Sequence, residues 1–246
     1  MTKRKKSTGS GKIISLAENK YKLHLKNFEL TKKQHEFLKI AFDKNTKIIF
    51  VSGPAGSSKT FISIYAALQL FNMNMNQDLF YVRTIAESGE RNLGSLPGDV
   101  DEKFHPFMMP LQDKLTELLS KEQIKMLVEE GIVQCAPINY LRGASWDNKL
   151  VIADESQNFT RKELVTLITR IGNNSKYFIC GDPMQSDING KTGFAPLVDI
   201  FDDNECKEKG IHTFRFTKED ILRSEILKFI VNKLENNPVK QIIKNG

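Results

Sequence analysis

Short runs of branched and aromatic residues recur along the chain, separated by longer stretches that mix apolar and polar positions. The runs are nearly continuous in apolar character, which is typical of strands that are buried on both faces of a sheet. We predict six strands from them, over residues 47–52, 78–83, 131–136, 149–154, 176–181 and 212–216.

The stretches between these runs have the spacing of amphipathic helices. We predict helices over residues 58–71, 102–119, 121–130, 160–171, 193–201 and 218–235, and a further amphipathic helix around Gln34. Repeated alternation of strand and helix implies a parallel sheet with helices on both faces, so the expected fold class is α/β. Residues 86–132 insert a loop and two helices where one helix would suffice, which makes them a candidate substrate-facing excursion.

No internal repeat or Gly/Ser-rich linker divides the sequence after Gly11, so we expect a flexible basic arm over residues 1–20 and a single domain over residues 21–246. The net charge of +6 comes partly from this arm, and it fits either a contact with a polyanion or a solvated tail. No apolar run approaches the roughly 20 residues of a membrane span. Three widely spaced cysteines suit neither a disulfide framework nor a zinc site, and no signal peptide is expected, so we predict a cytoplasmic location.

The sequence GPAGSSKT resembles a phosphate-binding loop, and it follows a predicted strand and opens a predicted helix. In such a loop the backbone N–H groups and the helix N-terminus bind a polyphosphate. The Lys59 ammonium would lie against the outer phosphates, and the Thr60 hydroxyl would ligate Mg²⁺. The candidate nucleotide contacts are Gly53, Pro54, Ala55, Gly56, Ser57, Ser58, Lys59 and Thr60.

Ser58 departs from the usual pattern, which has glycine directly before the lysine. We expect this residue at the start of the helix, where serine is well tolerated. Gly53 and Gly56 still supply the conformational freedom that the loop needs. The motif therefore predicts a nucleotide site, and a weaker affinity or slower turnover is the expected cost of the substitution.

The stretch KLVIADESQN places two carboxylates, Asp154 and Glu155, at the end of a buried strand. This is the edge of a parallel sheet at which α/β folds bind ligands. Asp154 would hold Mg²⁺ directly or through water, and Glu155 would orient and deprotonate the attacking water. The next strand ends in GDPMQ, which would bring Gln185 beside the pair, within reach of a terminal phosphate or a water.

These motifs together resemble the PhoH-like ATPases, a family related to the N-terminal motor domain of superfamily 1 helicases. The resemblance runs from about Leu30 to Glu235 and includes TKKQ, GPAGSSKT, ESGERNLGSLPGD, INYLRGASW, VIADESQNFT, GDPMQSDI and ILRSEILKFIV. It implies a RecA-like P-loop NTPase fold that uses ATP and Mg²⁺.

The same resemblance implies roles for three further residues. Gln34 would recognise adenine, although the residues alone favour a solvated glutamine on a helix surface. Gln185 would sense the γ-phosphate. Arg223 would act as an arginine finger, either within its own subunit or on a neighbour.

Arg83, Arg91 and Arg142 lie in or near loops that follow predicted strands, on the side where helicase-like proteins place nucleic acid. Arginine in such loops suits contacts with phosphate groups. The family resemblance favours RNA over DNA as the partner. A lone motor domain lacks an inter-domain cleft, so we expect a homo-oligomer, with a hexameric ring as one arrangement.

An acid pair followed by a glutamine suits the activation of water, so the leading hypothesis is a helicase-like ATPase coupled to nucleic acid. Two alternatives remain open. The first is a nucleotide-dependent binding switch with negligible turnover, which the substitution at Ser58 favours. The second is a P-loop kinase acting on a small molecule, against which the acid pair and the glutamine count.

Overall fold

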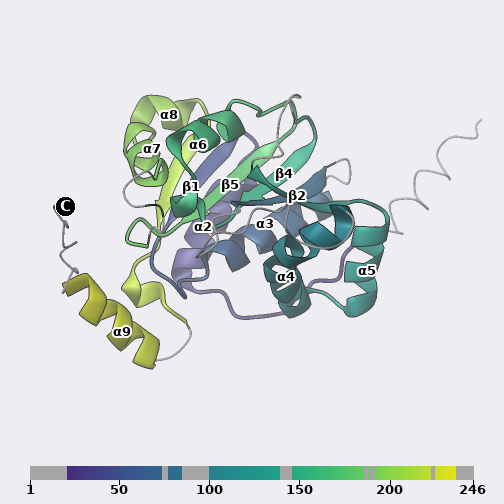
Figure 1. Cartoon of the computed structure of the whole chain (residues 1–246), viewed down its shortest axis with the longest axis horizontal. Helices are drawn as coiled ribbons and strands as arrows, with labels where there is room; N and C mark the ends of the chain where they lie inside the picture. The colour runs from purple at the N-terminus through teal and green to yellow at the C-terminus, as the bar shows by residue number, and fades with distance from the viewer. Residues whose placement is uncertain are drawn as a thin grey trace, which may run out of the picture.

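The computed structural model describes residues 21–73, 77–84, 100–138, 146–185, 188, 192–222 and 225–236, without the side chains of 100–107, 234 and 235. Six parallel strands form one sheet in the order β3-β2-β4-β5-β1-β6 (Figure 1). The strands are β1 (Ile48–Ser52), β2 (Asp78–Arg83), β3 (Val133–Pro137), β4 (Lys149–Ala153), β5 (Lys176–Gly181) and β6 (Ile211–Arg215). The predicted strands are confirmed, with identical bounds for β2 and β5 and bounds that differ by one or two residues for the other four.

Helices cover both faces of the sheet, which confirms the expected α/β class (Figure 1). On one face lie α2 (Lys32–Phe42), α3 (Lys59–Met73), α4 (Val100–Leu118) and α5 (Lys121–Glu129). On the other face lie α6 (Arg161–Ile168) and α7 (Phe194–Ile200), while α8 (Asn204–Glu208) packs beside β6. The last helix, α9 (Glu225–Asn236), extends away from the sheet (Figure 1).

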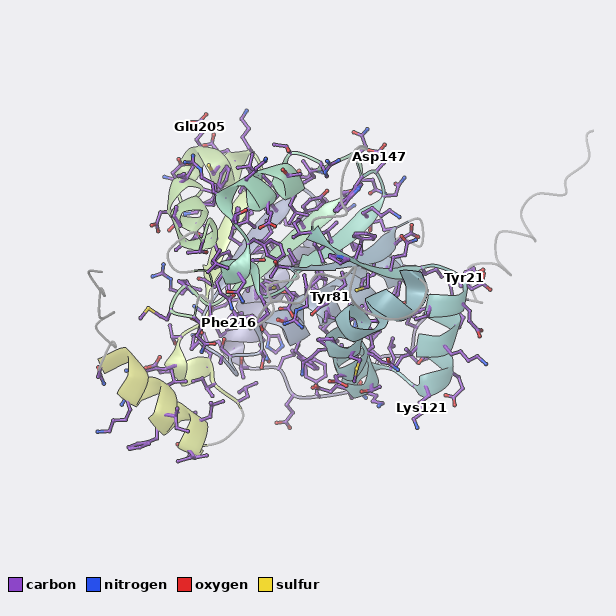
Figure 2. The ribbon with its side chains drawn as sticks, viewed as in Figure 1. Tyr21, Tyr81, Lys121, Asp147, Glu205 and Phe216 are labelled. Atoms are coloured by element: carbon purple, nitrogen blue, oxygen red, sulfur yellow. The ribbon has the colours of Figure 1, made fainter. Side chains whose placement is uncertain are left out.

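Two hydrophobic cores follow from the two-residue period of the strands. In β1, Ile49 and Val51 pack toward α2 and α3, whereas Ile48 and Phe50 pack toward α6 and α7. Because both faces are covered, every residue of β1 is buried, and this explains its continuous apolar sequence. Figure 2 shows Tyr81 in the interior, with Lys121, Asp147 and Glu205 at the periphery.

The predicted helix over residues 218–235 is wrong in its first half. Residues Lys218–Asp220 form a single 3₁₀ turn, and α9 begins only at Glu225. Ile221 between them is extended and almost fully buried, and the N–H of Leu222 donates to the Gly56 carbonyl over 3.4 Å. The chain therefore leaves the helical path because this segment packs onto the loop that follows β1.

Two further expectations from the sequence concern the N-terminal arm and membrane-spanning helices. The basic arm over residues 1–20 lies outside the described residues, so the division into an arm and one domain stays a prediction. Among the helices that the structure describes, none combines the length and the apolar character needed to cross a bilayer. The short helix α8 was not predicted from the sequence.

Candidate active site

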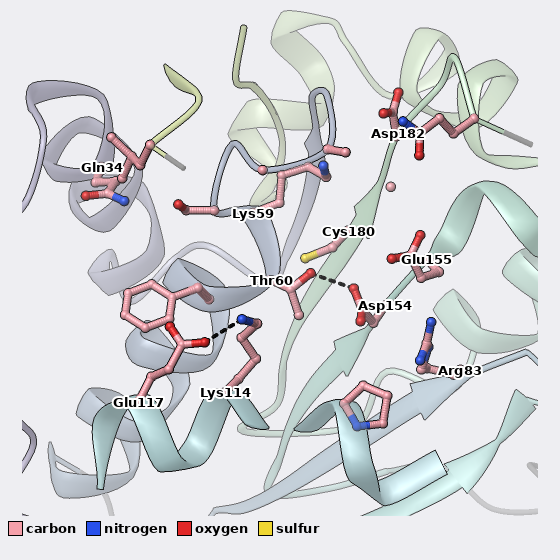
Figure 3. A pocket seen from close by; sticks show the side chains of 18 of the residues that line it. Gln34, Lys59, Thr60, Arg83, Lys114, Glu117, Asp154, Glu155, Cys180 and Asp182 are labelled. Atoms are coloured by element: carbon pink, nitrogen blue, oxygen red, sulfur yellow. Dashed lines mark hydrogen bonds and ion pairs between the residues drawn. The ribbon is translucent and has the colours of Figure 1, made fainter. Parts of the chain in front are cut away.

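In the sheet, β5 lies between β4 and β1. The carboxyl ends of these three parallel strands are therefore neighbours at one edge of the sheet. The loop after β1, the acids after β4 and Asp182 after β5 therefore face one cavity of about 520 Å³ (Figure 3). Its lining includes Lys59, Thr60, Asp154, Glu155 and Gln185, which the sequence analysis expected to converge.

The loop that precedes α3 is shaped by close packing and by internal hydrogen bonds. Gly53 has a φ of +152°, and a Cβ atom there would lie 2.7 Å from the carbonyl oxygen of Phe216. Gly56 also has a positive φ, of 80°. The Ser57 hydroxyl donates to the Pro54 carbonyl over 2.8 Å, which closes the turn from within. Glycine is required at 53 because backbone from the end of β6 covers it.

Ser58 does not have the conformation expected from the sequence. Its φ of 64° lies in the left-handed region, which residues with a Cβ atom adopt at a cost of about 1–2 kcal/mol. The prediction that serine is well tolerated at this helix start was therefore wrong in its reason, because glycine suits this position through its backbone freedom. The surrounding hydrogen bonds hold the loop closed despite the strain.

Lys59 lies at the mouth of the loop, where its ammonium donates to the Pro54 carbonyl over 2.8 Å. Burial lowers the pKa of Lys59, and the negative charges of Asp182, Glu155 and Asp154 oppose that shift. A neutral carbonyl is a weaker partner for an ammonium than a phosphate oxygen would be. The side chain is thus positioned to exchange this contact for an anionic ligand.

Asp154 is held between two hydroxyl groups. Thr60 donates to its Oδ1 over 2.6 Å (Figure 3), and Tyr81 donates to its Oδ2 over 2.5 Å. Burial raises the pKa of Tyr81 well above its usual value, and the Asp154 charge raises it further, so the hydroxyl remains a donor. The Thr60 hydroxyl oxygen and the Asp154 carboxylate oxygens are neighbouring hard ligands in the cavity, the kind of oxygen ligand that Mg²⁺ prefers.

Glu155 follows Asp154 after the end of β4 and also lines the cavity, and its φ of 51° is left-handed. The Gln157 amide donates to Glu155 Oε2 over 2.6 Å and accepts the backbone N–H of Asp182 over 3.0 Å. Gln157 thereby fixes the Glu155 carboxylate relative to the end of β5. Gln185 is exposed at the rim of the same cavity.

Gln34 lines the opposite end of the cavity and is only 2% exposed. The expectation from the residues alone, a solvated glutamine, was wrong, and the recognition of adenine implied by the family resemblance stays a prediction. Gln34 forms a capping box with Thr31, in which its amide oxygen accepts the Thr31 N–H over 3.0 Å. Phe28 and Phe61 line the same cavity, and their rings pack edge to face with centroids 5.0 Å apart.

The helix α4 forms a further wall of the cavity, with Pro110, Lys114 and Glu117 on the face that lines it. Lys114 and Glu117 form an ion pair at 2.5 Å (Figure 3). This helix belongs to the excursion predicted over residues 86–132, so part of that segment does reach the site.

The sequence analysis did not identify five residues of the site, namely Phe28, Tyr81, Lys114, Glu117 and Gln157. Tyr81 carries a usable signal, because it lies two residues before the polar end of its strand and so shares a face with that end. Arg83, expected to contact nucleic acid, lines this cavity. Arg91, Arg142 and Arg223 lie outside the described residues.

Comparison with known proteins gives matches over most of the chain. The family model described as PhoH-like protein matches residues 28–235. A PhoH-like protein from Synechocystis is 35% identical over 209 residues, which cover 84% of this chain and 62% of the relative. A PhoH-like protein from Mycobacterium tuberculosis H37Rv is 34% identical over 194 residues, which cover 78% of this chain and 53% of the relative.

The chain thus spans about half the length of most of the curated relatives it matches. Among solved structures, the Pif1 helicase from Candida albicans superposes with a TM-score of 0.43 at 16% identity, covering 85% of this chain and 44% of that one.

Proposed function

We propose, from the premise that this chain belongs to the PhoH-like protein family, that it hydrolyses ATP with Mg²⁺ and couples hydrolysis to nucleic acid. The chain is a P-loop NTPase, with its phosphate-binding loop between β1 and α3. The observation that carries the proposal is the convergence of an ammonium, a hydroxyl–carboxylate pair and a second carboxylate on one cavity.

Each of these groups has a distinct task in the proposed reaction. The loop N–H groups and Lys59 bind the outer phosphates, with Lys59 leaving the Pro54 carbonyl to do so. Thr60 and Asp154 would hold Mg²⁺, which supplies charge neutralisation at the phosphates when bound. Glu155, fixed by Gln157, accepts a proton from the attacking water.

The remaining contacts set specificity and sensing. Gln34 offers its amide to the adenine edge, next to the apolar surface of Phe28. Gln185 at the rim monitors the terminal phosphate, and Arg223 stabilises charge in the transition state, from its own subunit or from a neighbour.

The nucleic acid in this proposal is RNA rather than DNA, contacted by Arg91 and Arg142, and the protein acts in the cytoplasm as a homo-oligomer such as a hexameric ring. Support comes from the basic balance of the sequence, with a net charge of +6. Backbone contacts of this kind depend strongly on salt.

The first test measures phosphate release from ATP and Mg²⁺ by the wild type, Glu155→Gln and Lys59→Ala, with binding of ATP followed by calorimetry. We expect Glu155→Gln to bind ATP but to lose at least about 100-fold in turnover, as removal of a catalytic base does. Lys59→Ala should weaken binding itself. Glu205→Gln is the matched control, because the same change is made on the exposed helix α8, away from the cavity (Figure 2).

Adding single-stranded RNA or DNA to the same assay, at low and moderate salt, tests the coupling. Stimulation by RNA above that by DNA supports the proposal. Tight ATP binding without release would support the nucleotide-dependent switch, and phosphate transfer to an added metabolite would support the small-molecule kinase. Equal turnover of Glu155→Gln and wild type would refute the assignment of the base.

A further inference from the structure

Three residues form a row across the edge of the sheet on the face that α3 covers. Val82 is aligned with Ala153, and Ala153 with Ile179, so the next residues Arg83, Asp154 and Cys180 are neighbours across β2, β4 and β5. Adjacent strands are about 4.8 Å apart. The Arg83 backbone is thus one strand away from the acid pair, on the side opposite to the phosphate-binding loop.

The Arg83 side chain lies on the cavity side of the sheet. Residues two apart in a strand share a face, and Tyr81 on that face reaches Asp154 with its hydroxyl. Arg83 is partly buried and lines the same cavity as Thr60 and Glu155. Figure 3 shows its guanidinium pointing toward the two acids. Its positive charge also opposes the raised pKa of Tyr81, as expected of a group close to that hydroxyl.

The balance of charge around the phosphate end of the cavity gives this arginine a role. Three carboxylates, those of Asp154, Glu155 and Asp182, line this cavity. Its lining also includes two ammonium groups, those of Lys59 and Lys114, and Lys114 is paired with Glu117. A triphosphate adds several negative charges to that surface. The Arg83 guanidinium, on the far side of the acids from Lys59, supplies a further cation, and its planar donors match phosphate oxygens well.

We propose that Arg83 is a catalytic residue of the nucleotide site, whose guanidinium contacts the terminal phosphate of a bound nucleoside triphosphate. This rests on the proposed ATPase function and differs from the expectation that Arg83 contacts nucleic acid. In this assignment the terminal phosphate would lie between Lys59, at the start of α3, and Arg83, at the end of β2. Arg83 therefore distinguishes a triphosphate from a diphosphate and stabilises charge that develops on the transferred group.

The test compares Arg83→Gln with Arg83→Lys and with Arg215→Gln. Arg215 also ends a strand, but it is exposed on β6 and its neighbours Phe214 and Phe216 take the α3 face, so its side chain is on the other side of the sheet. Four quantities are measured for each protein: turnover, affinity for a non-hydrolysable ATP analogue, affinity for ADP, and affinity for single-stranded RNA.

We expect Arg83→Gln to lose about 100-fold in turnover, as removal of one donor to a transition state does. Its affinity for the ATP analogue should fall about 10-fold, while the affinities for ADP and RNA stay within about twofold of wild type. Arg83→Lys should recover part of the loss, because it restores the charge without the planar donors. Arg215→Gln should match wild type in all four measurements.

The inference is overturned if Arg83→Gln keeps wild-type turnover and wild-type preference for the ATP analogue over ADP. A fall in RNA affinity instead, with a shallower dependence on salt, would assign Arg83 to nucleic acid. If Arg83→Gln does not fold, Arg83→Lys decides by the same preference for triphosphate over diphosphate. Failure of the wild type to bind ATP would remove the proposed function and this assignment together, whereas normal hydrolysis by Arg83→Gln removes the assignment alone.

Discussion

Replacing Ser58 with glycine should stabilise the protein, although it removes a side chain from the phosphate-binding loop. The φ of 64° places Ser58 in the left-handed region, at a cost of about 1–2 kcal/mol that glycine avoids. Glycine also loses more backbone entropy on folding, by about 0.5–1 kcal/mol. The expected net gain is about 0.5–1 kcal/mol, which for a chain of this size raises Tm by about 1–4 °C.

Thermal and urea denaturation of wild type, Ser58→Gly and Ser58→Ala measure this gain. Ser58→Ala is the matched control, because it removes the hydroxyl but keeps the Cβ atom and hence the strain. Ser57→Gly serves as a second control, since it loses the hydrogen bond to Pro54 and should be destabilised by about 1–2 kcal/mol. A Ser58→Gly protein no more stable than Ser58→Ala would refute the claim that the backbone at this position is strained.

Three other substitutions test buried contacts, two of them at the site and one at Lys176, at the opposite end of β5 from the site. Gly53→Ala should lower the free energy of unfolding by at least about 2 kcal/mol, because its Cβ would lie 2.7 Å from backbone oxygen of Phe216 at a φ of +152°; urea denaturation measures this. Tyr81→Phe should cost about 1–3 kcal/mol in the same assay, because it removes a donor from the buried Asp154. Lys176 donates to the carbonyl oxygens of Ala41 and Asp43 at the end of α2, and burial lowers its pKa to about 8. Between this value and the usual 10.5 the unfolded chain binds more protons, so stability relative to Lys176→Met should rise with pH from about 8 to 10.5, by up to about 1.4 kcal/mol per pH unit.

A specific result would contradict each of these three predictions. A Gly53→Ala protein as stable as wild type would show that the end of β6 can move off the loop. Unchanged stability of Tyr81→Phe would show that the Thr60 hydroxyl alone satisfies Asp154. A stability difference between wild type and Lys176→Met that stays constant or falls above pH 8 would contradict the lowered pKa of Lys176.

The sequence was sufficient to predict the strands, the class of fold and the residues that meet at the sheet edge. Apolar runs buried on both faces are continuous, so β1, β4 and β5 were recognisable without any tertiary information. The phosphate-binding loop, the acid pair and Gln185 each follow a predicted strand. Because the carboxyl ends of parallel strands lie at one edge of the sheet, the sequence already implied that Lys59, Asp154 and Gln185 converge.

What could not be predicted depends on contacts between distant segments. The left-handed backbone of Ser58 is fixed by loop packing, and the break at Ile221 depends on the contact with Gly56. The burial of Gln34 reflects the packing of α2 on α3. Helical periodicity carries none of this information. The predicted helix over residues 218–235 therefore continued through Ile221, where the backbone of the structure is extended.

The most direct test is a crystal structure with Mg²⁺ and a non-hydrolysable ATP analogue. We expect phosphates against the loop N–H groups, the Lys59 ammonium moved from the Pro54 carbonyl to a phosphate oxygen, and one metal ion beside Thr60 and Asp154. A structure in which the analogue binds elsewhere, with Lys59 still on Pro54 and no metal between Thr60 and Asp154, would contradict this expectation.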